Sequence, residues 1–183
     1  MLKITFAKTE LFNNETQQFF DIPGGTFNFE HSLLSVSKWE SKYCKPFLTD
    51  DEAFTKTASE WMYYFKCMCT NENFNPALIT PDTQTKLLEY IKRNQTATRI
   101  KPSKPDPGKS KPYMSSELLY ANMANTNVPF TAERWPLSRL MALLGIIADQ
   151  NTDPKDKQMS ADETREMQRR LNEQRRKEMN SKG

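Results

Sequence analysis

The chain has 183 residues, of which 37% are hydrophobic and 27% are charged, and its formal net charge is +3. This composition suits one folded domain with appended polar segments. No run approaches the roughly 18 apolar residues of a transmembrane helix, and the first residues lack the apolar stretch of a signal peptide, so we expect neither a membrane protein nor a secreted one.

The first 31 residues predict a small antiparallel β unit. Residues 3–6 and 18–22 are apolar and rich in β-prone side chains, and residues 26–30 alternate with a period of two. Pro23-Gly24-Gly25 is a strong turn signal between the last two of these segments.

Apolar residues spaced by three or four positions predict helices after residue 31. Pro46 disturbs the end of the first helix, and Thr57 or Thr49 could cap the second. The two apolar stripes are Val36, Trp39, Tyr43 and Phe47, then Phe54, Ala58, Trp61, Met62, Phe65 and Met68. We expect four aromatic residues to hold the fold together: Trp39, Tyr43, Trp61 and Trp135.

Two further helices flank a Pro-rich stretch. Thr80 and Pro81 start a helix well, because a proline at the first helical position wastes no donor. Residues 101–112 hold four prolines and four lysines against one aspartate, which is typical of a linker or mobile loop. Ser115 or Ser116 then opens the next helix.

The last third of the chain contains the most apolar helix and the most polar one. Pro136 must lie in the first turn of the apolar helix or kink it. A capping box begins the polar helix at Ser160, but few apolar residues follow, so this helix is solvated or docked on a partner. The apolar stripe of the first of these helices is Leu137, Leu140, Met141, Leu144 and Ile147.

Together these elements predict an α+β protein that is mostly α-helical, with a small N-terminal antiparallel β unit, a helical bundle and an extended C-terminal helix. Residues 155–183 carry nine Lys or Arg against six Asp or Glu, whereas the rest of the chain carries 17 of each. The expected divisions are a β unit (1–31), a helical region (32–99), a Pro/Lys-rich linker or loop (100–113), a helical region packing on the first (114–153) and a polar C-terminal helix or tail (154–183).

Cysteine and histidine are the residues that could carry chemistry. Cys67 and Cys69 are two positions apart, so on a helix they face different ways and cannot share one ion, and zinc needs about four N or S ligands. A nucleophilic pair of Cys44 and His31 lacks an orienting third group and an oxyanion site. We therefore expect no catalytic residue, no metal and no cofactor. The thiols should be reduced and at least partly buried, and His31 should satisfy backbone groups at a strand-to-helix junction.

The basic segments offer a nucleic-acid-binding alternative. Arg169-Arg170 and Arg175-Arg176-Lys177 cluster near the C-terminus, and lysines lie in residues 101–112. Interleaved glutamates form ordinary i,i+4 pairs such as Glu166 with Arg170, and the tail has no aromatic residue to stack on bases. A solvated helix face is favoured over a nucleic-acid site.

Several short blocks, in an order that spans nearly the whole chain, resemble a family of small proteins encoded by tailed bacteriophages. Pro136 departs from the family pattern, which has a polar residue or histidine there, and this predicts a bent start to the helix that follows. The similar blocks are Glu30–Leu33, Ser37–Lys42, Lys45–Leu48, Phe65–Met68, Val128–Phe130, Trp135 with Leu137 and Arg139-Leu140, Met159-Ser160 and Leu171–Arg176.

The resemblance implies a tail assembly chaperone of long-tailed, siphophage-type phages that acts without catalysis in the bacterial host cytoplasm. Such a protein binds the long helical tape measure protein, shields its apolar surface, and gives way as tail tube subunits polymerise. The partners implied are the tape measure protein and tail tube or tail tip proteins, with self-association also open. The alternative within the same resemblance is a structural protein retained in the virion tail or tail tip.

Two kinds of surface would serve such work. Exposed apolar grooves can accept amphipathic helices, and a polar C-terminal helix can recruit other tail subunits. The residues we expect to contact a partner on that helix are Met167, Leu171, Arg170 and Arg175.

Overall fold

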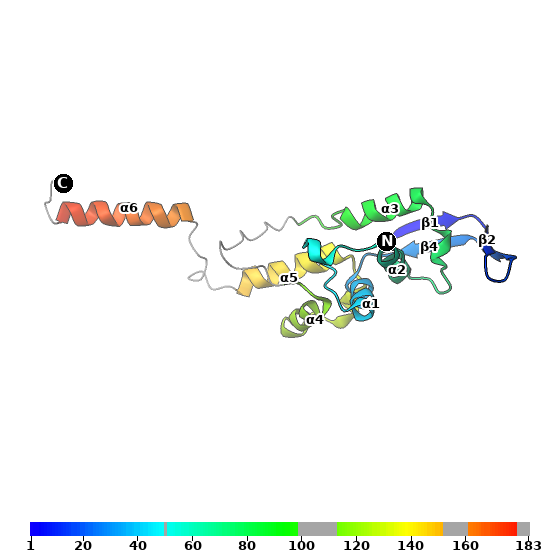
Figure 1. Cartoon of the computed structure of the whole chain (residues 1–183). Coiled ribbons are helices and arrows are strands. Elements are labelled where there is room, and N and C mark those ends of the chain that lie inside the picture. Colours follow the sequence, from blue (N-terminus) through cyan, green and yellow to red (C-terminus); the bar gives the residue numbers. More distant parts are fainter. Residues whose placement is uncertain (50, 99–112, 152–160, 179–183) are drawn as a thin grey trace. The chain divides into compact units, whose positions relative to one another are not determined.

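The computed structural model describes residues 1–49, 51–98, 113–151 and 161–178 (Figure 1). The chain divides into two compact units, Met1–Ile146 and Ile147–Gly183, and each is considered by itself. The expected α+β class is confirmed, because short antiparallel strands come first and helices follow. The segment expected to be a linker, residues 101–112, and the expected cap Ser160 lie outside the described residues.

The N-terminal strands form one long antiparallel ribbon that is interrupted once. Strand β1 pairs with β4, and β2 pairs with β3, in two separate two-stranded sheets. The numbers of paired residues add up to 31 in both sheets, as in Leu2 with Phe29 and Asn13 with Gln18, so the register continues across the break. The strands are β1 (Leu2–Phe6), β2 (Thr9–Asn13), β3 (Gln18–Ile22) and β4 (Gly25–Phe29).

The interruption coincides with Pro23 and Gly24. Proline has no N–H to donate to a ladder, so it breaks strand pairing at its position. Gly24 packs so closely that a Cβ atom there would lie 2.4 Å from the carbonyl oxygen of Phe6. The face of the ribbon that packs on the core also changes at the break. The buried residue Phe29 of β4 has an odd number, whereas the buried residue Ile22 of β3 has an even one, so the two side chains belong to opposite faces of the continuous ribbon.

Side-chain caps explain where four of the helices begin, the first of them at Ser32, which forms a capping box with Ser35. Thr57 and Glu60 form a reciprocal capping box on α2, and Thr80 with Pro81 at the first helical position starts α3, as the sequence predicted. Ser115, rather than Ser116, caps α4. The helices are α1 (Leu33–Tyr43), α2 (Ala58–Met68), α3 (Pro81–Lys92), α4 (Ser116–Asn125), α5 (Leu137–Asn151) and α6 (Ala161–Glu178), with 3₁₀ turns at Glu52–Phe54, Pro76–Leu78 and Phe130–Arg134.

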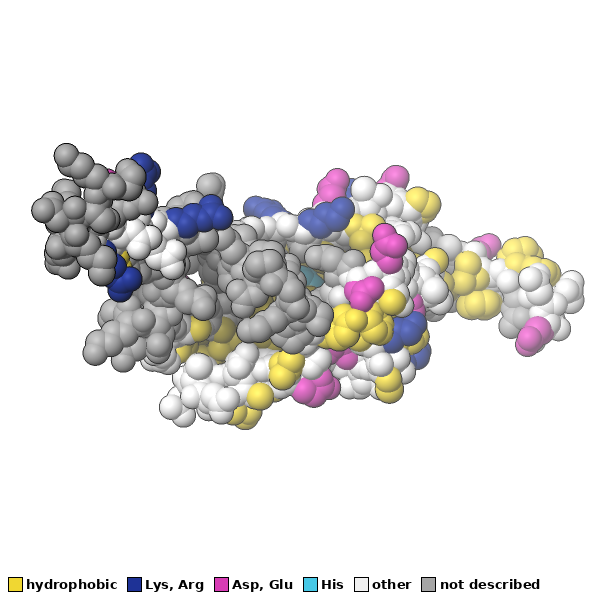
Figure 2. All heavy atoms as spheres, turned by 60° about the vertical axis from the view of Figure 1, so that its left-hand side comes forward, with side chains coloured by type: hydrophobic (Ala, Val, Ile, Leu, Met, Phe, Trp, Pro, Cys, Tyr) yellow, Lys and Arg dark blue, Asp and Glu magenta, His cyan; other side chains and the backbone are white. Residues whose placement is uncertain are grey.

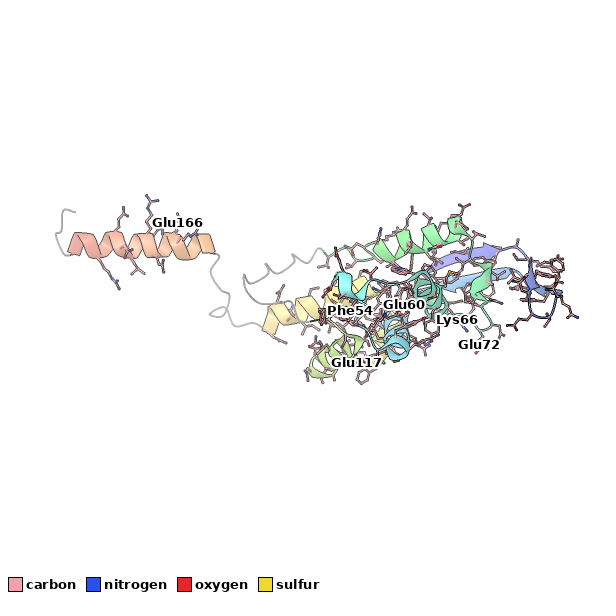
Figure 3. The ribbon with its side chains drawn as sticks, viewed as in Figure 1. Phe54, Glu60, Lys66, Glu72, Glu117 and Glu166 are labelled. Atoms are coloured by element: carbon pink, nitrogen blue, oxygen red, sulfur yellow. The ribbon has the colours of Figure 1, made fainter. Side chains whose placement is uncertain are left out.

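Two residues expected on helical stripes lie outside those helices. Helix α1 ends at Tyr43, before Pro46, and Cys44 takes a left-handed conformation with φ of 52°. The chain then turns back, and Phe47 stacks on Tyr64 with ring centroids 4.0 Å apart. Phe54 lies in a 3₁₀ turn instead of extending α2 (Figure 3). The spacing of apolar residues therefore predicted both helices correctly but made each of them too long.

The core of the first unit joins β4 to helices α1–α5. Trp39 is fully buried, and its Nε1 donates to the carbonyl oxygen of Glu60 at 3.0 Å. Tyr43, Trp61 and Trp135, which we also expected to support the fold, are half-buried. The other large, fully buried side chains are Tyr64, Phe29, Phe65, Leu33, Met68, Leu87, Leu119, Met123, Leu140 and Val36.

Backbone hydrogen bonds tie the strand unit to the helices. The amide of Glu30 donates to the carbonyl of Met68, which links the end of β4 to the end of α2. The amide of Leu137 donates to the carbonyl of His31 at 2.8 Å. Pro136 lies directly before α5, where its missing N–H costs no helical bond and its carbonyl accepts from Leu140. The N-terminal unit is thus fixed to the helical part by its exit segment.

Candidate interaction surfaces

A buried polar cluster surrounds the single histidine. His31 Nδ1 forms a hydrogen bond with the hydroxyl of Tyr64, which also lies 3.2 Å from Ser35 Oγ. The ring of His31 has lost most of its hydration to neighbouring side chains, and this desolvation lowers its pKa from 6.5 to about 4. Burial also raises the pKa of Tyr64. Both side chains are therefore neutral at pH 7, and the histidine bonds to a side-chain hydroxyl instead of the backbone groups we expected.

A second polar cluster centres on Glu30. One carboxylate oxygen of Glu30 lies 2.8 Å from the amino group of Met1, and the other accepts from the hydroxyl of Tyr90 at 2.9 Å. Desolvation, followed by the hydrogen bond to Glu30, raises the pKa of Tyr90. These contacts hold β1 and α3 to the strand-to-helix junction, which makes the cluster a structural element.

The cysteines do not form a site with the histidine. Cys44, Cys67 and Cys69 are all free thiols, and no hydrogen bond of the described residues joins His31 to any of them. Burial raises the pKa of Cys67 and of Cys69, so both favour the unreactive thiol form. Cys44 is exposed, contrary to the expectation of partly buried thiols. Within the described ranges, no three His, Cys, Asp or Glu side chains are placed to hold a metal ion.

The hairpin of β2 and β3 exposes three phenylalanines. Phe12, Phe19 and Phe20 have exposed fractions of 44%, 71% and 45%. The rings of Phe12 and Phe19 lie on opposite strands, with centroids 4.9 Å apart. Figure 1 shows the hairpin extending beyond the pairing of β1 with β4, and Figure 2 shows hydrophobic side chains gathered on this projection. A two-stranded hairpin is marginally stable alone in water, so this apolar surface fits one that a partner covers.

A groove of about 420 Å³ lies between β1 and α3. Four consecutive β1 residues line it, Leu2–Thr5. On the other side it is lined by Thr83, Lys86, Glu89 and Tyr90 of α3 and by Arg93 directly after the helix, and three of these five side chains are charged. Its lining includes Lys3, Lys86, Arg93 and one acid, Glu89, so this groove is more polar than the apolar groove the sequence suggested.

The predicted partner-binding residues lie on α6, in the second unit. Leu171 is 47% exposed, and Arg170 and Arg175 are exposed as well. The side chain of Met167 lies outside the described residues. Glu166 projects from the same helix (Figure 3). The helix predicted over this segment is present, and whether these residues contact a partner stays a prediction.

Comparisons with known protein families, with curated proteins and with solved structures found no match. None of the helices within the described ranges is both long and apolar enough to cross a membrane.

Sequence reasoning missed the exposed hairpin, although a signal for it exists. Residues 9–13 read Thr-Glu-Leu-Phe-Asn, in which the two apolar residues are adjacent, so the alternation typical of a strand is absent and the signal is weak. The segment Gln18–Ile22 was predicted as a strand, but its three apolar residues imply burial rather than exposure. A clue lies in the four polar residues at 14–17, which suit a hairpin loop and place the two segments opposite each other.

Proposed function

We propose that this chain is a non-enzymatic protein of phage tail morphogenesis, a tail assembly chaperone that binds the tape measure protein and tail subunits in the bacterial host cytoplasm. The ordered sequence blocks motivate the proposal. The observation that carries it is the set of exposed phenylalanines on the β2–β3 hairpin, because a chaperone needs apolar surface that is accessible in the free protein.

The chemistry of the hairpin suits transient shielding of apolar helices. Phe12 and Phe19 offer two adjacent aromatic rings, and aromatic side chains contribute large contact areas at interfaces. The acidic side chains of Glu10 and Asp21 pair across the strands on the same face, beside the two rings. A partner segment that places apolar residues on the rings and basic residues beside them would be bound, and polymerising tail tube subunits would then displace the chaperone.

Co-expression with the tape measure protein of the same phage tests the proposal. The tape measure protein should become soluble with the wild-type chain and remain insoluble with a Phe12→Ser/Phe19→Ser double variant. Phe130→Ser removes another exposed phenylalanine, at 56% exposure, far along the chain, and should preserve the effect. No gain in tape measure solubility with the wild-type chain would overturn the proposal.

Mass spectrometry of purified virions separates this proposal from the alternative of a retained tail protein. A chaperone should be absent from finished virions, whereas a tail or tail-tip component should be present in a fixed number of copies.

A further inference from the structure

The groove between β1 and α3 has the size of a small-ligand site. Helix α3 contacts β1 along one side of the groove, whose volume is about 420 Å³ (Figure 1). Binding clefts for small molecules commonly measure about 300–1,000 Å³. The groove therefore suits a ligand such as a sugar phosphate or a mononucleotide, and it is too small for a folded partner.

Two hydroxyl groups of the lining are already used within the protein. The hydroxyl of Tyr90 donates to the carboxylate of Glu30 at 2.9 Å, and the amino group of Met1 compensates the charge of that carboxylate. Thr83 Oγ1 donates to the carbonyl of Thr80 and accepts from its amide in the capping box of α3. These contacts fix the walls of the groove, and its charged side chains are the groups left to bind a ligand.

Three cations line the groove from two sides. Lys3 lies on β1, Lys86 on α3 and Arg93 directly after α3, and all three side chains are exposed. Glu89 is the one acid in the lining, so three positive charges and one negative charge give the groove a net charge of +2. Within the described part of the chain, no ion pair includes any of these four side chains. A bound anion would therefore break no existing ion pair there.

A phosphate group matches this arrangement better than a carboxylate. A phosphate monoester carries close to two negative charges at pH 7 and has three acceptor oxygens, which suit the net charge and the three cations of the groove. Arg93 offers the planar fork of donors that fits phosphate, and the flexible stem of a lysine lets its ammonium group turn toward a bound anion. A phosphate group alone would fill only a small part of the groove, and the rest is left for the body of an ester.

We propose that the groove between β1 and α3 binds a small phosphate ester. The cations bind the phosphate group, and the organic part of the ester lies along the groove. Glu89 opposes the phosphate electrostatically, but its carboxylate accepts hydrogen bonds from hydroxyl groups of the organic part. This surface is separate from the β2–β3 hairpin, so the inference is independent of the proposed function.

Titrations of the full chain, followed by the chemical shifts of its backbone amides in NMR spectra, test the proposal. The probes are two esters, ribose 5-phosphate and AMP, with inorganic phosphate and ribose for comparison. Each ester should shift the amides of residues 2–5 and 83–93 with a Kd on the order of 1 mM at low salt, because exposed cations are screened by solvent. Inorganic phosphate should bind about threefold more weakly or worse, and ribose should cause no shift. Raising NaCl to about 0.3 M should weaken ester binding about fivefold.

Substitutions that change the charge in opposite directions test whether the groove is the site. The double variant Lys86→Ala/Arg93→Ala should weaken ester binding about fivefold or more, whereas Glu89→Gln should tighten the binding of inorganic phosphate about twofold. Lys66→Ala is the matched control, because Lys66 is an exposed lysine on α2, and it should leave both affinities unchanged (Figure 3). All four side chains are exposed, so circular dichroism and the unfolding temperature should stay those of the wild type.

Three results would overturn the proposal. If neither ester shifts the groove amides at about 10 mM, the groove does not take this class of ligand. Shifts that survive the double variant, or that fall only on the arginines of α6, place the anion elsewhere. Equal affinities for inorganic phosphate and for both esters show that the groove does not hold the organic part.

Discussion

The buried carboxylate of Glu40 should be among the most sensitive positions of the fold. Its Oε1 accepts from the backbone N–H of Phe47 and its Oε2 from that of Ser116, each at 2.7 Å, and all three residues are buried. One side chain thereby joins the end of α1, the segment after it, and the first turn of α4. The anion also lies at the N-terminus of α4, where it interacts favourably with the helix dipole.

Replacing Glu40 with alanine leaves two buried N–H groups without an acceptor. At about 1–3 kcal/mol for each unsatisfied group, the free energy of unfolding should fall by about 2–6 kcal/mol. Glu40→Gln keeps one acceptor and turns an amide NH₂ toward the other N–H, so its loss should be about 1–3 kcal/mol. The first value is a large fraction of the total stability of a typical domain, about 5–15 kcal/mol.

Urea unfolding followed by tryptophan fluorescence measures both losses. With an m value of about 2 kcal/mol/M, Glu40→Gln should lower the midpoint by about 0.5–1.5 M. Glu72→Gln makes the same chemical change at an exposed site and should alter stability by less than about 0.5 kcal/mol (Figure 3). If Glu40→Ala costs less than 1 kcal/mol, or no more than Glu72→Gln, the reasoning from its two hydrogen bonds is refuted.

Three further predictions concern the polar contacts of α2 and its neighbours. The hydrogen bond from Lys45 lowers the pKa of Glu60, so the ionised side chain stabilises the fold fully at pH 7, and this contribution is lost as the pH falls from about 4.5 through the lowered pKa. The difference in urea midpoint between the wild type and Glu60→Gln should therefore shrink between pH 7 and pH 3. A difference that does not depend on pH would contradict this. Because the pKa of His31 is lowered, the unfolded chain binds a proton that the folded chain rejects, so wild-type stability should fall from pH 6.5 to 4, and the same titration of His31→Gln should lack that slope. Trp39→Phe removes the hydrogen bond to the carbonyl of Glu60 and leaves a cavity, so thermal unfolding should show a loss of about 2–4 kcal/mol; an unchanged midpoint would refute the burial argument.

The sequence predicted the parts of the fold that depend on local rules. Thr80 with Pro81 and Thr57 with Glu60 cap helices because each motif satisfies donors within its own first turn. The helix of Trp39 was predicted because a stripe at helical spacing needs no distant information. The same spacing placed Phe47 on this helix, although Phe47 lies beyond its end and contacts Tyr64 on another helix.

The surfaces could not be predicted, because exposure is a property of the assembled chain. Phe19 in sequence resembles any buried strand residue, and only the break at Pro23 separates it from the core. The groove depends on β1 lying beside α3, whose residues are 75 or more positions away in the sequence, and no local pattern encodes that contact. The single histidine was placed at the right junction, but its partner Tyr64 lies 33 residues away.

The break in the ribbon also makes the direction of the hairpin sensitive to one position. Gly24 leaves no room for a side chain beside the carbonyl of Phe6, so any other residue there must push the two segments apart. The pairing of β1 with β4 and the pairing of β2 with β3 would each be kept, while the angle between the two sheets changed. A substitution at this one position is therefore expected to change the direction of the projecting phenylalanines without altering the helices.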